Sequence, residues 1–165
     1  KALRKFGAIN STYAISTDGQ PATIEYDQIN ISVAVALPDG LVAPVVRDAD
    51  KKSLGTIAAE VRDLASRARE GKIKQNELEG STFQVSNLGM YDVTEFTSII
   101  PVSMAGSLSV GAVRQVPVVK DGQIVPGERM TVTLSLDHRV ADGATGAQYL
   151  QELRKLLESP MSLLV

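Results

Sequence analysis

The chain has 165 residues, of which 44% are hydrophobic and 22% are charged, and this composition is typical of one globular domain. Its 17 basic and 19 acidic residues give a net charge of −2, which argues against a general nucleic-acid surface or an anionic-membrane surface. The absence of cysteine excludes a disulfide framework, a thiolate metal site and a cysteine nucleophile, and the single histidine, His138, excludes a multi-histidine metal centre.

The N-terminal part of the sequence predicts a helical start and a β-hairpin. Residues Lys1–Phe6 resemble the middle of a helix and include no initiator methionine, so we expect the chain to begin inside a domain. Apolar side chains alternate from Gln28 onward as in a half-buried strand, a turn is predicted at Pro38–Gly40, and Leu41–Val46 predicts the returning strand. Pro44 indicates an edge or a bulge. These apolar stretches are far too short to span a membrane.

An amphipathic helix is predicted from Leu54 to Ala68, because apolar residues recur there at steps of three and four. Ser53 is the candidate N-cap, and Gly71 occupies the position where a glycine commonly ends a helix. A solvated face is expected on the other side of this helix, formed by Arg62, Asp63, Arg67 and Glu70.

The rest of the sequence predicts more strands and a final helix. Four strands are expected, over Thr82–Ser86, Met104–Val113, Val116–Val119 and Met130–Leu136. Lys120–Gly122 is a hairpin turn signal between the last two strands. The final helix is predicted from about Gly143 to Ser159, where Pro160 stops it. These elements indicate an α/β (α+β) fold in which strands outnumber helices.

Two segments carry candidate functional residues. His138 is followed by Asp142 and Gly143 at the junction of a strand and the last helix, where α/β proteins expose reactive side chains. The alternative is that His138 is a polar loop residue and Asp142 only the N-cap of the helix. The second segment, Ser81–Met90, ends a strand in small polar residues and also fits a plain strand exit. Gly106–Val113 has the glycine spacing of a phosphate loop but lacks its lysine and hydroxyl residue, so we reject that motif.

These segments resemble the catalytic domain of the dihydrolipoamide acyltransferases, the core subunits of 2-oxo acid dehydrogenase complexes. The resemblance is carried by Asp137–Ala144 and Gly80–Met90, extends over the whole chain, and is strongest to the acetyltransferases of pyruvate dehydrogenase complexes. It implies a chloramphenicol-acetyltransferase-like fold, with a central mixed β-sheet flanked by helices. It also implies that residues 1–165 are an acyltransferase core domain lacking its N-terminal part, without the lipoyl and subunit-binding domains that normally precede it.

The reaction that the resemblance implies moves an acetyl group between the thiols of dihydrolipoamide and coenzyme A, without a metal. His138 would accept the thiol proton, because the pKa of a free thiol lies only about two units above that of imidazole. The resemblance assigns Ser86 as hydrogen-bond donor to the oxyanion and Asp142 as a supporting catalytic residue. Ser86, Asn87 and Gly111 would line the coenzyme A channel, and Arg139 would anchor its loop by an ion pair.

The resemblance also implies an assembly with partners. Ser86 and His138 would meet across the interface of a homotrimer, and trimers would join into a core of 24 or 60 subunits, with the apolar C-terminus Met161–Val165 as an inter-trimer knob. The implied partners are the pyruvate dehydrogenase and dihydrolipoamide dehydrogenase components and the lipoyl domain. The implied location is a mitochondrial matrix or a bacterial cytoplasm.

Two other functions stay open at this point. A non-catalytic relative could form the structural core of the same complex, although such relatives commonly lack the histidine. A serine hydrolase using Ser86 and His138 fits less well, because the residues around Ser86 do not form a nucleophile elbow. The chain also departs from the family pattern at Ala36 and at Ile100–Met104, which affects the expected acyl-pocket or interface contacts.

Overall fold

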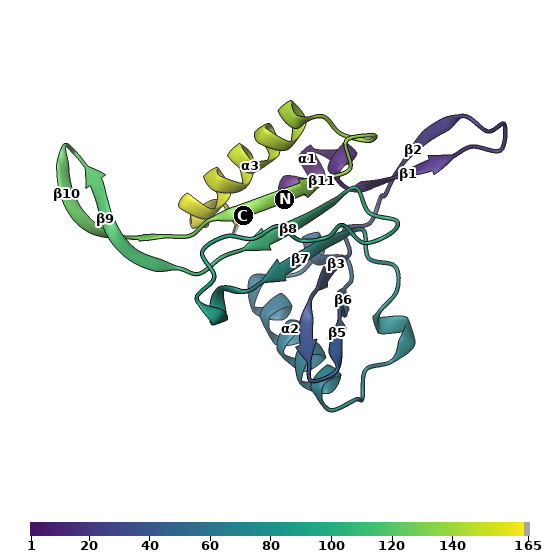
Figure 1. Cartoon of the computed structure of the whole chain (residues 1–165), viewed down its shortest axis with the longest axis horizontal. Helices are drawn as coiled ribbons and strands as arrows, with labels where there is room; N and C mark the ends of the chain where they lie inside the picture. Colours follow the sequence, from purple (N-terminus) through teal and green to yellow (C-terminus); the bar gives the residue numbers. More distant parts are fainter. Residues whose placement is uncertain (164–165) are drawn as a thin grey trace.

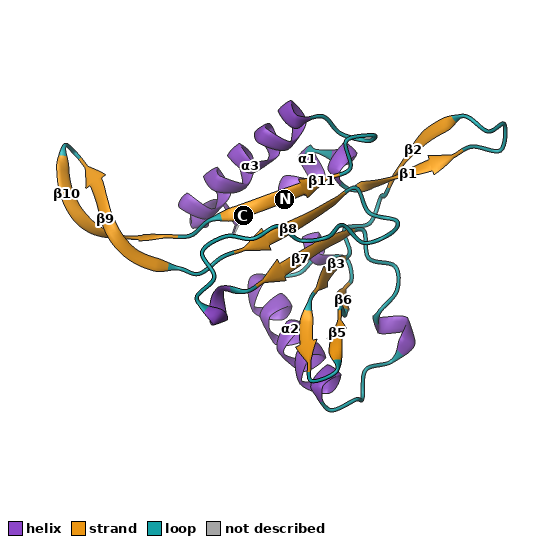
Figure 2. Cartoon of the chain, viewed as in Figure 1, coloured by secondary structure: helices purple, strands orange, loops and turns teal. Residues whose placement is uncertain are grey.

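A mixed five-stranded sheet forms the centre of the protein, which a computed structural model describes over residues 1–163 (Figure 1, Figure 2). Its strands are β3 (Ile31–Val33), β6 (Val45–Val46), β7 (Phe83–Asn87), β8 (Gly106–Val110) and β11 (Val132–Leu136). They lie in the order β11-β8-β7-β3-β6, with β7 parallel to both of its neighbours and β11 and β6 antiparallel to theirs. The expected α/β (α+β) class, with a central mixed sheet flanked by helices, is confirmed.

The hydrophobic core lies between one face of this sheet and two helices, α1 (Ala2–Lys5) and α3 (Gly143–Glu158). Phe83 of β7 points into the core and lies against Tyr149 of α3, with ring centroids 6.1 Å apart. Burial raises the pKa of Tyr149 well above its usual range. Gly146 allows α3 to approach the sheet, because a β-carbon there would lie 2.6 Å from a leucine side chain of β11.

The predicted hairpin over residues 28–46 is divided between two sheets, which corrects the expectation of two continuous strands. After β3 the chain continues into β4 (Val35–Leu37), which pairs with β5 (Gly40–Val42) in a separate two-stranded sheet. The break occurs at Pro44: its carbonyl accepts a hydrogen bond from Val33 N–H at 3.0 Å, but proline has no N–H to donate to the ladder. The expected edge position is confirmed, because β6, which follows Pro44, ends the central sheet.

The helix α2 (Leu54–Arg69) packs against β4 and β6 (Figure 1). Its start follows from the sequence, because Ser53 Oγ accepts a hydrogen bond from the backbone N–H of Thr56 at 3.2 Å. Just beyond its end, Gly71 adopts a φ of +69°, a conformation that glycine reaches without steric strain. Its inner face is buried at Leu64. The predicted helix, its N-cap and its terminal glycine are therefore confirmed.

Two hairpins project from the central sheet in different directions (Figure 1). They are β1 (Ser11–Ile15) with β2 (Pro21–Glu25), and β9 (Arg114–Lys120) with β10 (Gln123–Arg129). The predicted turn at Lys120–Gly122 is confirmed, and β9 is longer than the expected strand Val116–Val119. The turn leads into β10, which is not among the predicted elements, whereas the expected strand Met130–Leu136 corresponds to β11 and pairs with β8. The β1–β2 hairpin is not among the predicted elements, even though Asp18 and Gly19 at its tip are typical turn residues. The predicted strand over Met104–Val113 shortens to β8.

The C-terminal segment follows the prediction closely. Helix α3 ends at Glu158, and Pro160 begins the short 3-10 helix η5 (Pro160–Leu163). Two residues of the expected C-terminal knob, Leu164 and Val165, lie outside the described residues, whereas Met161 is exposed. None of the helices within residues 1–163 combines the length and apolar character that a membrane span requires.

Gly111, just after β8, marks a close approach of two backbone segments. Its N–H donates a hydrogen bond to the Thr131 carbonyl at 2.9 Å. A β-carbon at this position would overlap the carbonyl oxygen of Thr94 and would lie 2.8 Å from its carbonyl carbon. Because the obstacle is backbone, no side-chain rotation can relieve the overlap.

We therefore expect Gly111→Ala to lower the free energy of unfolding by about 1–3 kcal/mol, the usual effect of overpacking. Gly55→Ala in the first turn of α2 is the matched control, because the nearest atom to its added β-carbon lies 3.9 Å away and alanine favours a helix. Urea unfolding of the three proteins measures the difference. Equal stability of Gly111→Ala and the unchanged protein would contradict the close packing.

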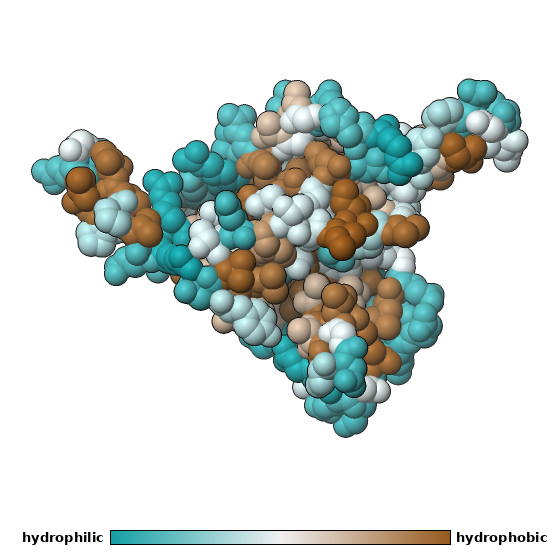
Figure 3. Space-filling model, viewed as in Figure 1, coloured by the Kyte–Doolittle hydropathy of each residue, from teal (hydrophilic) through white to brown (hydrophobic). Residues whose placement is uncertain are grey.

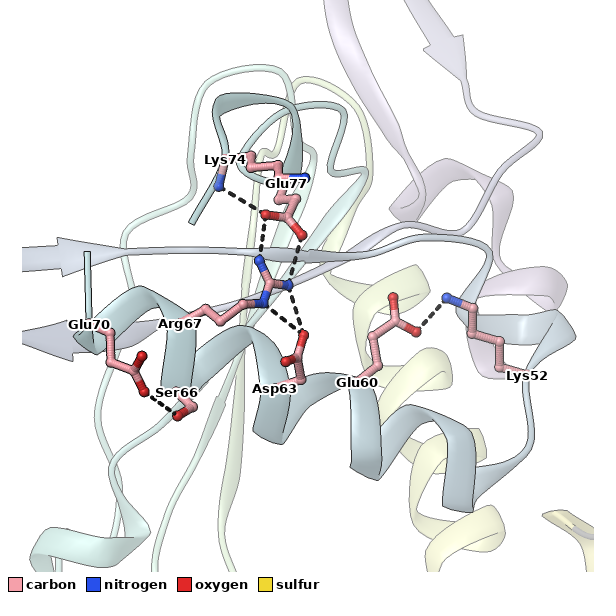
Figure 4. Close-up of polar contacts among 8 residues, drawn as sticks. All are labelled: Lys52, Glu60, Asp63, Ser66, Arg67, Glu70, Lys74 and Glu77. Atoms are coloured by element: carbon pink, nitrogen blue, oxygen red, sulfur yellow. Dashed lines mark hydrogen bonds and ion pairs between the residues drawn. The ribbon is translucent and has the colours of Figure 1, made fainter. Parts of the chain in front are cut away.

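Arg67 connects α2 to the segment that follows it (Figure 4). Its guanidinium donates to both carboxylate oxygens of Glu77 at 2.8 Å and to Oδ2 of Asp63, one turn earlier, at 2.8 and 2.9 Å. Glu77 also accepts a hydrogen bond from the backbone N–H of Lys74 at 2.9 Å. These bonds, those from Arg67 most strongly, lower the pKa of Glu77 to about 2. The predicted solvated face of α2 thus includes Arg67, which makes an ion pair with Glu77 outside the helix.

Because its pKa is lowered, the ionised Glu77 stabilises the folded chain at pH values above the ordinary glutamate pKa of 4.5. This contribution to the free energy of unfolding is lost as the pH falls toward 2. Glu77→Gln should therefore be less stable than the unchanged protein near neutral pH, and the difference should shrink in acid. Thermal unfolding near neutral pH and near the pKa of about 2 tests this. Glu79→Gln is the control, because among the described residues the Glu79 side chain accepts a hydrogen bond from Gln75 alone. A pH-independent difference would contradict the assignment.

Candidate active site

His138 lies in the turn that connects β11 to α3. Main-chain bonds hold this turn: Asp137 N–H donates to the Ala105 carbonyl at 2.8 Å, and Val140 N–H donates to the Asp137 carbonyl at 3.0 Å. The His138 side chain is exposed, and within residues 1–163 its ring has no hydrogen-bond partner. The turn is therefore fixed by its main chain, while the imidazole is open to solvent.

Arg139 anchors the turn, as the sequence predicts. Its Nη2 lies 2.6 Å from Asp137 Oδ2, and its Nε lies 2.9 Å from Oδ1. The guanidinium carbon also lies 4.0 Å from the ring centroid of Tyr13, in a cation–π contact. The bonds from Arg139 lower the pKa of Asp137, and the same bonds raise the pKa of Arg139. Both neighbours of His138 in the sequence are thereby held in place.

Asp142 caps the N-terminus of α3. Its Oδ1 accepts a hydrogen bond from the backbone N–H of Thr145 at 2.7 Å, which is the capping role left open by the sequence. The hydrogen bonds from Thr145 lower the pKa of Asp142, and the nearby His138 lowers it further. Asp142 is therefore a carboxylate close to His138 that also fixes the start of the helix.

Ser86 and Asn87 lie at the end of β7, beside a cavity of about 370 Å³. The cavity extends between α2 and the β4–β5 sheet, and its walls are apolar apart from Ser86, Asn87, Arg69 and Tyr91. Ser86 is half-buried, and its hydroxyl has no hydrogen-bond partner in the described part of the chain. Asn87 Oδ1 accepts from Gly89 N–H at 2.8 Å. Ala36, a departure from the family pattern, lines the same cavity.

A network of hydroxyl groups beside Ser86 is not among the predicted site features. Ser109 stands next to Ser86 in the parallel pair of β7 and β8, and its hydroxyl donates to Ser98 Oγ at 2.9 Å. Ser98 Oγ also lies 2.8 Å from Ser107 Oγ, which accepts from Gln84 at 3.1 Å. Polar residues at every second position of β7 and β8 are the signal that could have revealed this polar face of the sheet.

Of the remaining predicted features, Gly111 lies beside the end of β7, whereas the Ile100–Met104 segment lies apart from Ser86. Gly111 is buried against the Thr94 carbonyl, and its expected place in a coenzyme A channel stays a prediction. The turn Pro101–Met104, within the second departure from the family pattern, lies beside the His138 turn. The two turns are linked by the bond between Asp137 and Ala105, and they line one cavity together.

Ser86 and His138 do not meet within one chain. Ser86 pairs with Ser109, and Ser109 pairs with Thr133, so Ser86 lies level with Thr133 of β11. His138 follows the far end of β11, beyond Leu136. At about 3.3 Å per residue along a strand and about 5 Å between strands, Leu136 already lies roughly 10 Å along the sheet and roughly 10 Å across it from Ser86. A direct contact between the two side chains within one chain is therefore excluded.

Comparisons of the sequence with known proteins agree on one family. A family model described as 2-oxoacid dehydrogenases acyltransferase (catalytic domain) matches residues 1–165. The dihydrolipoyllysine-residue acetyltransferase component of the pyruvate dehydrogenase complex of Rickettsia bellii is 39% identical over 165 residues, all of this chain and 38% of that protein. The mitochondrial component of Neurospora crassa is 40% identical over 147 residues, 86% of this chain and 32% of that protein. The chain thus spans about two fifths or less of the length of these relatives.

Solved structures give the same result. The Azotobacter vinelandii dihydrolipoamide acetyltransferase is 36% identical with a TM-score of 0.90, over 99% of this chain and 66% of that one. A truncated catalytic core from Thermoplasma acidophilum is 34% identical with a TM-score of 0.82, over 96% and 69%. A chloramphenicol acetyltransferase, 18% identical with a TM-score of 0.52 over 94% and 72%, shows the fold alone and confirms that the fold is chloramphenicol-acetyltransferase-like. Because the family model matches its whole length, the chain belongs to the 2-oxoacid dehydrogenase acyltransferases, as a catalytic-domain sequence.

Proposed function

We propose that this chain transfers an acetyl group between the thiol of dihydrolipoamide and the thiol of coenzyme A. The observation that carries the proposal is the position of His138, the only imidazole of the sequence, exposed in a turn that Asp137 and Arg139 hold rigid. The pyruvate dehydrogenase acetyltransferase relatives, at 36–39% identity over the full chain, support the choice of the acetyl group.

His138 acts as the general base in this proposal. One ring nitrogen accepts the proton of the attacking thiol, its sulfur bonds to the thioester carbonyl carbon, and the carbonyl π electrons move to the oxygen. The tetrahedral intermediate then collapses, the original carbon–sulfur bond breaks, and the imidazolium returns the proton to the departing thiolate. Both reactive thiols belong to the substrates, which agrees with a sequence that contains no cysteine.

Ser86 would donate the hydrogen bond that stabilises the negative oxygen of that intermediate. Its unpaired hydroxyl supports this role, because the donor needs no rearrangement before it can bind an oxyanion. The Azotobacter enzyme was investigated for the catalytic roles of a serine, a histidine and an asparagine. The serine lies 52 positions before that histidine, and the asparagine lies four positions after it. In this chain Ser86 and Asp142 have the same two spacings from His138.

The active site in this proposal is shared between copies of the chain. Strand direction keeps Ser86 and His138 apart in one copy, so His138 of one copy would approach Ser86 of the next within a homotrimer. Both projecting hairpins expose apolar side chains that other copies could cover, such as Ile24 (51% exposed) and Ile124 (77% exposed) (Figure 3). A 35% identical structure is the cubic core of a pyruvate dehydrogenase complex, which supports further assembly into a core of 24 or 60 subunits.

Coenzyme A would bind on the Ser86 side of the shared site. The cavity beside Ser86 and Asn87 has the size of a small-ligand pocket, and Arg69 brings a positive charge to it. The second substrate would arrive as the lipoyl group of a lipoyl domain. The pyruvate dehydrogenase and dihydrolipoamide dehydrogenase components would then be partners of the assembled core, in a bacterium or a mitochondrion like the relatives.

A complementation experiment tests both the chemistry and the shared site. His138→Ala should lower the rate of acetyl transfer at least about a hundredfold through loss of the base, and Ser86→Ala should do so through loss of the oxyanion donor. The two variants are unfolded together in equal amounts and refolded as mixed trimers. Random mixing then leaves about one quarter of the interfaces with both an intact His138 and an intact Ser86. We therefore expect transfer activity to return to about one quarter of the wild-type value.

The other functions predict different results. A non-catalytic core protein would show the same transfer rate, at background, with and without the His138→Ala change. A serine hydrolase would accumulate an acetylated Ser86 that intact-mass spectrometry detects after exposure to acetyl-coenzyme A. If the mixed variants stay inactive while both single variants assemble normally, the shared site is wrong.

Asp142 combines a capping role with its position near His138, and two substitutions separate these roles. Asp142→Ala removes the cap and should lower the unfolding temperature by about 3 °C. Asp142→Asn keeps an acceptor oxygen for Thr145 N–H and should unfold near the wild-type temperature. If the carboxylate charge assists His138, Asp142→Asn should lower the rate of acetyl transfer while stability is retained. An unchanged rate for Asp142→Asn would limit Asp142 to capping.

A further inference from the structure

The unpaired hydroxyl of Ser86 lies next to another serine of the same sheet face. Ser86 of β7 pairs with Ser109 of β8, and because Val85 and Leu108 point into the core, both serines point to the opposite face. Neighbouring strands lie about 4.8 Å apart, so two serine hydroxyls that turn toward each other reach hydrogen-bond distance. That Ser86 has no partner within residues 1–163 therefore has to be explained.

The hydroxyl of Ser109 is already engaged by Ser98. It donates to Ser98 Oγ at 2.9 Å and accepts from the backbone N–H of Ser98 at 3.0 Å. A serine hydroxyl has a single proton to donate, so the bond to Ser98 directs the Ser109 proton away from Ser86. Ser109 is only 1% exposed, and bulk water is therefore no alternative partner for it.

Ser98 is itself held in the position that this arrangement requires. Because its Oγ accepts from Ser109, its own proton goes to Ser107 Oγ, 2.8 Å away. Ser107 is fully buried and also accepts from Gln84 at 3.1 Å. The Ser98 carbonyl accepts from Ser135 Oγ at 2.9 Å. The N–H, the hydroxyl and the carbonyl of Ser98 are thus all bonded to side chains of β8 and β11.

The segment that contains Ser98 is also fixed at its two ends. Near its start, Ala112 N–H donates to the Val93 carbonyl at 2.8 Å. Near its end, Tyr26 Oη donates to the Ser103 carbonyl at 2.9 Å. Removal of the Ser98 hydroxyl alone leaves these bonds in place, together with the two main-chain bonds of Ser98. The segment should therefore keep its course in a variant that lacks this hydroxyl.

We propose that Ser98 is a positioning residue for Ser86: by engaging the Ser109 hydroxyl, it keeps the Ser86 hydroxyl free to bind an oxyanion. Without Ser98 Oγ the Ser109 proton has no acceptor, and a buried hydroxyl without a partner is unfavourable. Ser109 then pairs with Ser86, whose side chain turns along the sheet instead of toward a substrate. This inference deepens the proposed acetyl transfer and rests on the oxyanion role that it gives to Ser86.

Two substitutions that remove equal numbers of hydrogen bonds separate this role from a purely structural one. Ser98→Ala removes the bonds of Ser98 Oγ to Ser107 and Ser109, and Ser109→Ala removes both bonds between Ser109 and Ser98. We expect Ser98→Ala to lower kcat about tenfold and to change either KM by less than about twofold, because an oxyanion donor acts in the transition state. Ser109→Ala should keep kcat within about twofold of the wild-type value, because it removes the competing hydroxyl.

The double variant, Ser98→Ala with Ser109→Ala, gives the sharpest comparison. It lacks more hydrogen bonds than either single variant, yet its kcat should return to within about twofold of the wild-type value. Thr97→Ala is the control, because Thr97 is exposed and its hydroxyl has no partner among the described residues. The inference is wrong if the double variant is as slow as Ser98→Ala, or if Ser109→Ala is as slow, because the serines would then act through structure alone.

Crystal structures of the wild-type protein and of Ser98→Ala separate this inference from the proposed function, because they require no activity. Ser86 Oγ should lie within hydrogen-bond distance of Ser109 Oγ in Ser98→Ala and beyond it in the wild-type protein. If this difference is seen in a protein that transfers no acetyl group, the proposed function fails while Ser98 still keeps Ser86 unpaired. If transfer proceeds and Ser86 stays unpaired in Ser98→Ala, the inference alone fails.

Discussion

The antiparallel pairing of β11 with β8 determines where the chemistry of this protein can take place. Because β11 runs opposite to β7 and β8, the turn after it carries His138 to the edge of the sheet where β7 begins, while Ser86 lies toward the edge where β7 ends. No side-chain rotation can span that separation. The proposed reaction, which uses both groups, would therefore need two copies of the chain.

The two faces of the same sheet have different roles. Apolar side chains on one face pack against α1 and α3, and their burial stabilises the domain. On the other face, Ser107 and Ser109 are buried but satisfy each other's hydrogen bonds through Ser98, so that this polar face is stable without a ligand. Ser86 lies beside this network, and within residues 1–163 its own hydroxyl has no hydrogen-bond partner, which suits the proposed role of oxyanion donor.

The elements that the sequence predicts best are those whose limits depend on nearby residues. Helix α2 begins at the Ser53 cap, and α3 begins at the Asp142 cap, because each cap bonds a backbone N–H three residues later. The strand after Gln28 is predicted less well, because the effect of Pro44 depends on which strands lie beside it. The β1–β2 hairpin projects from the core and buries few side chains, so its apolar pattern is weak.

By itself, the sequence determined the kind of chemistry: one histidine, a serine 52 positions before it, no cysteine, and a family that these segments identify. Those features depend on side-chain type and on spacing along the chain. Only the tertiary structure decided that Arg139 is held between Asp137 and Tyr13, and that Ser86 and His138 are kept apart. The physical reason is that strand order and direction arise from hydrogen bonds and packing between distant segments, which no local pattern specifies.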